Sequence, residues 1–189
     1  MSSTLSPDIQ SLFGSALSEY EKRTGTSLTD NELSSRLRSC DSADSVIAVL
    51  QDQAQAFRKY RGDRGRVMIR LNQAVNALYT LSTSPVLVGG IGIPFPPATA
   101  IFAGIGTLLS AIKDVSASYD ALVELFELIE NFLRRLDIYT KVESTTAMTE
   151  IVVKILVELL ATLALATQQV KQGRLSGFIL RVNASFFAH

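Results

Sequence analysis

Apolar residues recur at helical spacing along almost the whole chain. In the first half they predict four helices, over residues 6–25, 31–37, 42–57 and 64–84. The pair Asp41 and Ser42 precedes the third apolar face and suits a helix cap, because short polar side chains accept hydrogen bonds from the first backbone N–H groups of a helix. The fourth helix is expected to end at Ser84-Pro85, since the residue before a proline disfavours helical backbone.

The most regular pattern lies between Ile101 and Leu136, where apolar residues follow one another at alternating spacings of four and three. This heptad pattern predicts one continuous helix of about 36 residues, roughly 54 Å long at about 1.5 Å per residue. A final long helix is predicted from Thr145 to Gln172. Because only residues 140–144 link these two helices, we expect them to pack antiparallel.

The chain is therefore predicted to be all-α, an up-and-down helical bundle of four main helices, two of them long, with shorter helices added. One bundle domain is expected over residues 1–172. Residues 173–189 are expected to form a C-terminal amphipathic tail, whose apolar residues share one helical face and are candidates for an interaction with a partner. These interaction candidates are Leu175, Phe178, Ile179, Val182 and Phe186.

The run from Leu71 to Ile112 contains no Asp, Glu, Lys, Arg or His. So long an uncharged stretch belongs in a packed core, in a partner interface or in a membrane. A standing membrane span is disfavoured, because residues 98–112 fall short of the roughly 20 apolar residues that cross the hydrocarbon. A bundle that exposes this segment only on activation is the alternative left open.

A basic cluster leads directly into this uncharged run. Between Arg58 and Arg70, Lys and Arg predominate and Asp63 is the single acid. Basic charge beside apolar residues suits an anionic membrane surface, since the charges attract lipid head groups while the apolar side chains enter the acyl boundary. The competing interpretation is a solvated basic turn beside a buried connection. The membrane candidates are Arg61, Arg64, Arg66, Arg70, Val86, Leu87, Val88, Ile91, Ile93 and Phe95.

Composition argues against several functions. The 18 basic and 18 acidic residues cancel, so the positive field that draws nucleic acid is missing. The one histidine, His189, and the one cysteine, Cys40, cannot build a His-based relay, a multi-histidine metal site or an internal disulfide. No enzyme activity, metal or cofactor is therefore expected. The carboxylates on the predicted long helix are interpreted as an exposed charge row, namely Glu124, Glu127 and Glu130.

The segment from Phe95-Pro96-Pro97 through Tyr119-Asp120 to Leu136 resembles the fungal Goodbye domain, found at the N-termini of NLR-like STAND proteins. The segments Tyr20 to Gly25 and Cys40 to Phe57 fit the same family. The resemblance implies an all-helical signalling or effector module with no catalytic residues. It also implies kinship with HeLo-like bundles of programmed cell death, for which membrane targeting is proposed. In the family, nucleotide-binding and repeat regions follow this module, whereas none follows it here, so a stand-alone member or an excised domain is expected.

Two functional hypotheses follow. In the first, the chain is a membrane-acting effector: oligomerisation or release of an inhibitory contact frees the apolar segment or the N-terminal helix, and the basic cluster holds the protein on anionic lipid. In the second, it is a soluble adaptor that binds a second copy or another helical protein through the heptad faces or the tail. Because residues 1–8 lack the basic and apolar regions of a secretory signal, we expect a cytoplasmic protein that becomes peripheral to the membrane on activation.

Overall fold

The computed structural model describes residues 7–54, 64–83, 97–112, 119–140 and 145–179. Every regular element in this part of the chain is a helix, which confirms the all-α prediction. The helices are α1 (Pro7–Thr24), α2 (Glu32–Arg38), α3 (Ala43–Gln53), α4 (Arg64–Ser82), α6 (Pro97–Ala111), α7 (Tyr119–Thr140) and α8 (Thr146–Lys171).

Several helix boundaries follow from local chemistry. Asn31, Ser42 and Thr145 cap α2, α3 and α8, since each side-chain oxygen accepts a hydrogen bond from the backbone N–H three residues further on. Gly25 and Gly173 follow α1 and α8 with φ angles of 69° and 68°. This left-handed backbone lets the chain leave a helix at little energetic cost. The predicted cap at Ser42 and the predicted stop at Gly25 are thus confirmed.

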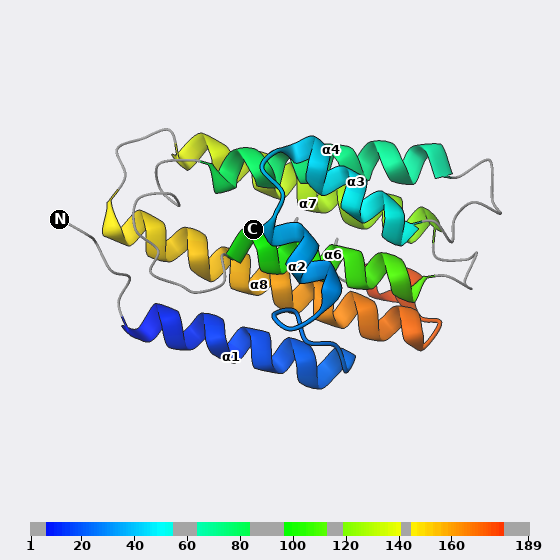
Figure 1. Cartoon of the computed structure of the whole chain (residues 1–189), viewed down its shortest axis with the longest axis horizontal. Coiled ribbons are helices and arrows are strands. Elements are labelled where there is room, and N and C mark those ends of the chain that lie inside the picture. Colours follow the sequence, from blue (N-terminus) through cyan, green and yellow to red (C-terminus); the bar gives the residue numbers. More distant parts are fainter. Residues whose placement is uncertain (1–6, 55–63, 84–96, 113–118, 141–144, 180–189) are drawn as a thin grey trace.

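The long helices pack side by side and run in two opposite directions. Helices α1, α6 and α8 run one way, and α4 and α7 run the opposite way (Figure 1). Helix α7 packs along α4, whereas α8 packs against both α1 and α6. Helices α2 and α3 lie over α6, and α3 also contacts α4. The main packing partners are therefore parallel neighbours. Helices α7 and α8 do run in opposite directions, but they make little contact with each other.

The prediction of one continuous helix from Ile101 to Leu136 is wrong. Helix α6 ends at Ala111, Ile112 lies in a turn, and α7 begins at Tyr119 and runs the other way. Ile112 and Tyr119 are one heptad apart, so the apolar register passes through the reversal unchanged, and both residues are buried. Periodicity alone could not detect this break. The predicted count of four main helices is wrong for the same reason, because the described residues hold five of 15 residues or more.

Helix α6 lies at the centre of the core. None of its 15 residues is charged, and most of them are buried. On α4, the other described part of the uncharged run, Leu71, Val75, Leu78 and Leu81 are each 0 % exposed. The apolar side chains in the described part of the uncharged run are therefore buried or partly buried in this fold.

Two glycines let α6 approach its neighbours closely. A Cβ added at Gly104 would lie 3.2 Å from Cδ1 of Leu163 on α8. A Cβ added at Gly106 would lie 2.6 Å from Cδ2 of Leu33 on α2 and 3.1 Å from Cδ2 of Leu50 on α3. Only a residue without a side chain fits at position 106 without moving the side chain of Leu33.

The substitution Gly106→Val is expected to lower the free energy of unfolding by about 1–3 kcal/mol, the usual effect of overpacking a core. Gly14→Val is the matched control in α1, because nothing lies within 4 Å of a Cβ at that position. It should change the free energy by less than about 0.5 kcal/mol. Urea unfolding followed by circular dichroism measures both values. Equal effects at the two glycines would contradict the close approach of α2 and α3 to α6.

Tyr20 places a buried hydroxyl between α1 and α6. The side chain is 1 % exposed, and its hydroxyl donates a hydrogen bond to the carbonyl of Gly104 at 3.4 Å. Burial raises the pKa of Tyr20 above its ordinary 10.0, and hydrogen bonds with Thr167 and Thr107 oppose this rise. The folded state therefore holds the phenolic proton more tightly than the unfolded chain does.

This difference predicts a fall in stability at high pH. The stabilisation is complete below the unfolded pKa of about 10 and is lost as the pH rises through the higher folded pKa. The substitution Tyr20→Phe should therefore make the free energy of unfolding fall less steeply between about pH 9 and pH 11. Urea unfolding across this range measures the slope, and identical slopes for the variant and the natural chain would refute the assignment.

Candidate functional site

Arginines of α4 face carboxylates of α7. Arg66 Nη2 lies 3.2 Å from Asp120 Oδ1. Arg70 Nη2 lies 3.3 Å from Glu127 Oε1, and Arg70 Nη1 lies 3.7 Å from Glu130 Oε2. These ion pairs advance in the same direction along both helices, as parallel packing requires. In the folded domain, the described side chains of the basic cluster are thus already paired with acids.

Glu130 is the buried member of this network. Its side chain is only 8 % exposed, and its Oε1 accepts a hydrogen bond from Nε of Arg134 at 2.8 Å. The prediction that places Glu130 in an exposed row is therefore wrong. Helix α7 turns this residue toward α4, where Arg70 and Arg134 offset the desolvation of the carboxylate. Glu124 is exposed, as predicted, and Glu127 is partly buried.

The substitution Glu130→Gln keeps the side-chain shape but removes the charge that Arg70 and Arg134 share. We expect the free energy of unfolding to fall by about 1–2 kcal/mol, less than for a fully buried pair because both arginines reach solvent. Glu124→Gln is the control on the same helix and should change it by less than about 0.5 kcal/mol. Urea unfolding at neutral pH measures both variants, and equal losses would argue against the ion-pair network.

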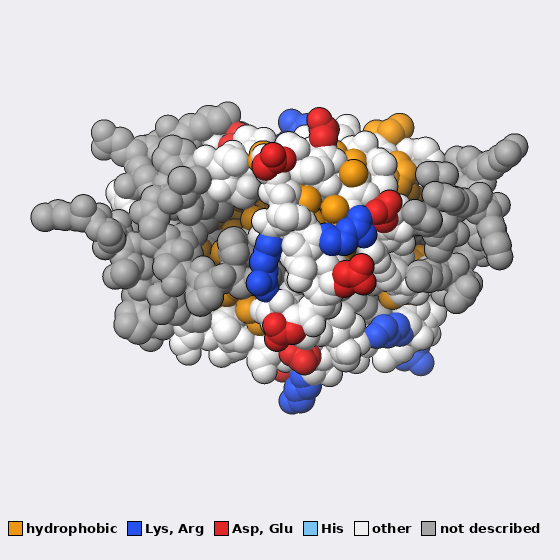
Figure 2. All heavy atoms as spheres, viewed as in Figure 1, with side chains coloured by type: hydrophobic (Ala, Val, Ile, Leu, Met, Phe, Trp, Pro, Cys, Tyr) orange, Lys and Arg blue, Asp and Glu red, His pale blue; other side chains and the backbone are white. Residues whose placement is uncertain are grey.

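The structure describes only part of the predicted membrane site. Arg66 and Arg70 lie on α4 with their side chains described, and Arg64 begins the same helix without a described side chain. Figure 2 shows basic and acidic side chains interspersed on the described part of one face of the molecule. The membrane candidates outside the described residues are Arg61, Val86, Leu87, Val88, Ile91, Ile93 and Phe95.

The interaction candidates in the predicted tail begin inside the fold. Residues 175–179 are helical and follow α8 closely. Leu175 and Ile179 are 1 % and 0 % exposed and belong to the core, and Phe178 is partly buried against it. Val182 and Phe186 lie outside the described residues. The first part of the tail thus packs on the helices that precede it.

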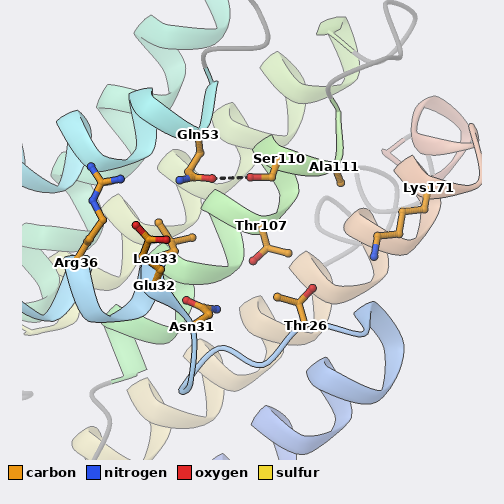
Figure 3. Close-up of a pocket in the computed structure, with 10 residues that line it drawn as sticks. All are labelled: Thr26, Asn31, Glu32, Leu33, Arg36, Gln53, Thr107, Ser110, Ala111 and Lys171. Atoms are coloured by element: carbon orange, nitrogen blue, oxygen red, sulfur yellow. Dashed lines mark hydrogen bonds between the residues drawn. The ribbon is translucent and has the colours of Figure 1, made fainter.

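A pocket of about 470 Å³ opens between α2, α3 and the C-terminal ends of α6 and α8 (Figure 3). Hydroxyl and amide side chains contribute to its lining beside apolar surface, and α8 contributes an ammonium group. Figure 3 shows Thr26 and Thr107 facing each other across the pocket, with Lys171 reaching in from α8.

Hydrogen bonds within the domain already use several of these groups. Ser110 donates to Gln53 at 2.8 Å, and Lys171 donates to a backbone carbonyl at the end of α1 at 2.6 Å. Arg36 turns toward α3 and pairs with Asp52, and this hydrogen bond raises the pKa of the guanidinium. The lining residues do not include a nucleophile held by a general base. The pocket therefore offers hydrogen bonding rather than an assembled catalytic group.

This pocket could not be predicted from the sequence, because its lining comes from positions spread between Thr26 and Lys171. The one available signal is the presence of Thr107 and Ser110, two hydroxyl residues in the apolar second half of the uncharged run. Among the described residues, no group of His, Cys, Asp and Glu is arranged to hold a metal ion. None of the described helices is both long and apolar enough to pass through a bilayer.

The fold and these surfaces define an all-helical domain built around an uncharged central helix. Comparison with known protein families matches residues 13–139 to the fungal STAND N-terminal Goodbye domain. The chain therefore belongs to this family, which confirms the resemblance seen in its sequence. The match runs from α1 to α7 and leaves α8 outside. No curated protein and no solved structure matches the chain.

Family membership supports a signalling or effector role. The Goodbye domain is an N-terminal effector domain of STAND proteins and is not a known family of enzymes.

Proposed function

We propose that this domain is a non-enzymatic signalling effector that acts by self-association and by conditional association with an anionic membrane. The observation that carries the proposal is the burial of α6, an uncharged helix of 15 residues in the centre of the fold. Apolar surface of this extent is core while the domain is closed, and it becomes a contact surface once the domain opens. Family membership supports the effector role.

The ion pairs between α4 and α7 make the membrane association conditional. Lipid phosphates would compete with Asp120 and Glu127 for the same arginines, Arg66 and Arg70. Membrane binding through the basic cluster is therefore weak while α4 and α7 remain paired, and it strengthens when the pairing is lost.

The length of α6 defines the kind of membrane contact. Its 15 residues are fewer than the roughly 20 needed to span the hydrocarbon. Association at the lipid–water interface fits this length, with apolar side chains in the acyl boundary and basic side chains among the head groups.

Vesicle binding tests this function. The double variant Asp120→Asn, Glu127→Gln removes two carboxylates that hold the α4 arginines. It should sediment with phosphatidylserine–phosphatidylcholine vesicles at least about fivefold more strongly than the natural chain, because each basic residue near such a surface contributes roughly 1 kcal/mol. Vesicles of pure phosphatidylcholine should bind neither protein.

The matched control is Glu124→Gln, Glu158→Gln. It changes the net charge by the same amount but removes exposed carboxylates of α7 and α8 instead. It should bind vesicles as the natural chain does. Equal binding by the two double variants would mean that the change in net charge alone causes the effect. That result would contradict the proposed role of the α4 arginines. Self-association without any vesicle binding would instead support the second candidate, a soluble adaptor for itself or another helical protein.

A further inference from the structure

Helix α6 is covered from two opposite sides. Successive residues of an α-helix are about 100° apart, so Gly104 and Gly106 point in nearly opposite directions. Gly104 faces Leu163 of α8, and Gly106 faces Leu33 and Leu50. We call residues 28–54, which hold α2, α3 and their connection, the strap, because this segment lies over the side of α6 that α8 leaves uncovered.

The two covers differ in intrinsic strength. Helices α2 and α3 have 7 and 11 residues, whereas α8 has 26. Helices shorter than about 12 residues are marginal in water and depend on their tertiary contacts. Helix α8 alone also buries more apolar side chains than the whole strap does. The strap is therefore the weaker of the two covers.

The pocket lies at the edge of the strap nearest the C-terminal end of α6. The pocket of about 470 Å³ separates strap residues such as Asn31 and Glu32 from Thr107 and Ala111 of α6. Beside the apolar contact of Leu33 with Gly106, this edge is held by a polar contact, in which Ser110 of α6 donates a hydrogen bond to Gln53 of the strap at 2.8 Å. A polar tie beside an open pocket resists separation less than continuous apolar packing does.

We propose that the strap opens as a unit while α1, α6 and α8 stay packed together, and that it thereby controls access to the uncharged surface of α6. The opening is a sub-global transition, distinct from unfolding of the whole domain. The purpose of this opening rests on the proposed function, but the opening itself is measured without membranes or partners. Failure of the vesicle experiment would therefore leave the strap test intact, and the reverse also holds.

Thiol labelling in the native state tests the strap. Leu50 and Leu163 are matched probes, because both are 0 % exposed and each touches an α6 glycine from one of the two sides. In the background Cys40→Ser, the variants Leu50→Cys and Leu163→Cys each carry one thiol. After correction for the measured stability of each variant, the thiol at position 50 should be labelled at least about tenfold faster. Its labelling should also depend only weakly on urea concentration, as a small opening requires.

The hydrogen bond between Ser110 and Gln53 allows a second test of the strap. Gln53→Ala, added to Leu50→Cys, should speed labelling at position 50 by about fivefold, the effect expected from loss of one hydrogen bond. Gln51→Ala is the matched control on the same helix, where the side chain is exposed, and should leave the rate unchanged. Gln53→Ala should leave the thiol at position 163 unaffected.

Hydrogen exchange on the unmodified chain tests the same opening without introduced cysteines, which could themselves disturb the fold. The amides of α2 and α3 should exchange faster than those of α8 and with a smaller dependence on urea. Equal rates and equal urea dependence for the two thiols, or for the amides of the strap and α8, would overturn the proposal.

Discussion

The fold depends on the need to keep water away from α6. A helix with one polar face needs neighbours on one side only, but α6 has no charged residue and must be enclosed. Helices α8, α2, α3 and α4 all contact it. Gly104 and Gly106 allow the closest of these contacts, because a side chain at either position would press on a leucine of the neighbouring helix. The position of α6 therefore determines how most other helices are placed.

Helix α7 packs apart from α6. Helix α8 packs against α1 and α6 and makes little contact with α7, and α7 buries its apolar stripe against α4. The two helices run in parallel, which brings Asp120 and Glu127, one heptad apart, beside Arg66 and Arg70. A carboxylate one turn further along, Glu130, is then buried and needs two arginines to compensate its charge. The charge pattern of α7 is thus matched to α4.

Local chemistry was predictable from the sequence, whereas pairing between distant segments was not. The predicted cap Ser42 acts on a backbone group three residues away, so neighbouring residues suffice to locate it. The reversal between Ile112 and Tyr119 left no trace in the apolar period because it spans one heptad. The burial of Glu130 and the composition of the pocket depend on which helices become neighbours, and residues far apart along the chain decide that. Within the candidate site, Arg66 and Arg70 were predicted from the sequence, but the carboxylates of α7 that pair with them were not.

Contacts between α3 and α4 connect the strap physically to the basic cluster, so that changes in the two are linked. Helix α3 contacts α6 on one side and α4 on another. The hydroxyl of Tyr79 on α4 also donates a hydrogen bond to the backbone carbonyl of Asp41, within the strap, at 2.5 Å. Opening of the strap therefore removes support from α4 at the same time as it uncovers α6. Because the arginines that face α7 are on α4, loss of that support weakens the ion pairs as well. Exposure of the uncharged helix and release of the basic side chains would then be parts of one transition, governed by the weakest cover of the core.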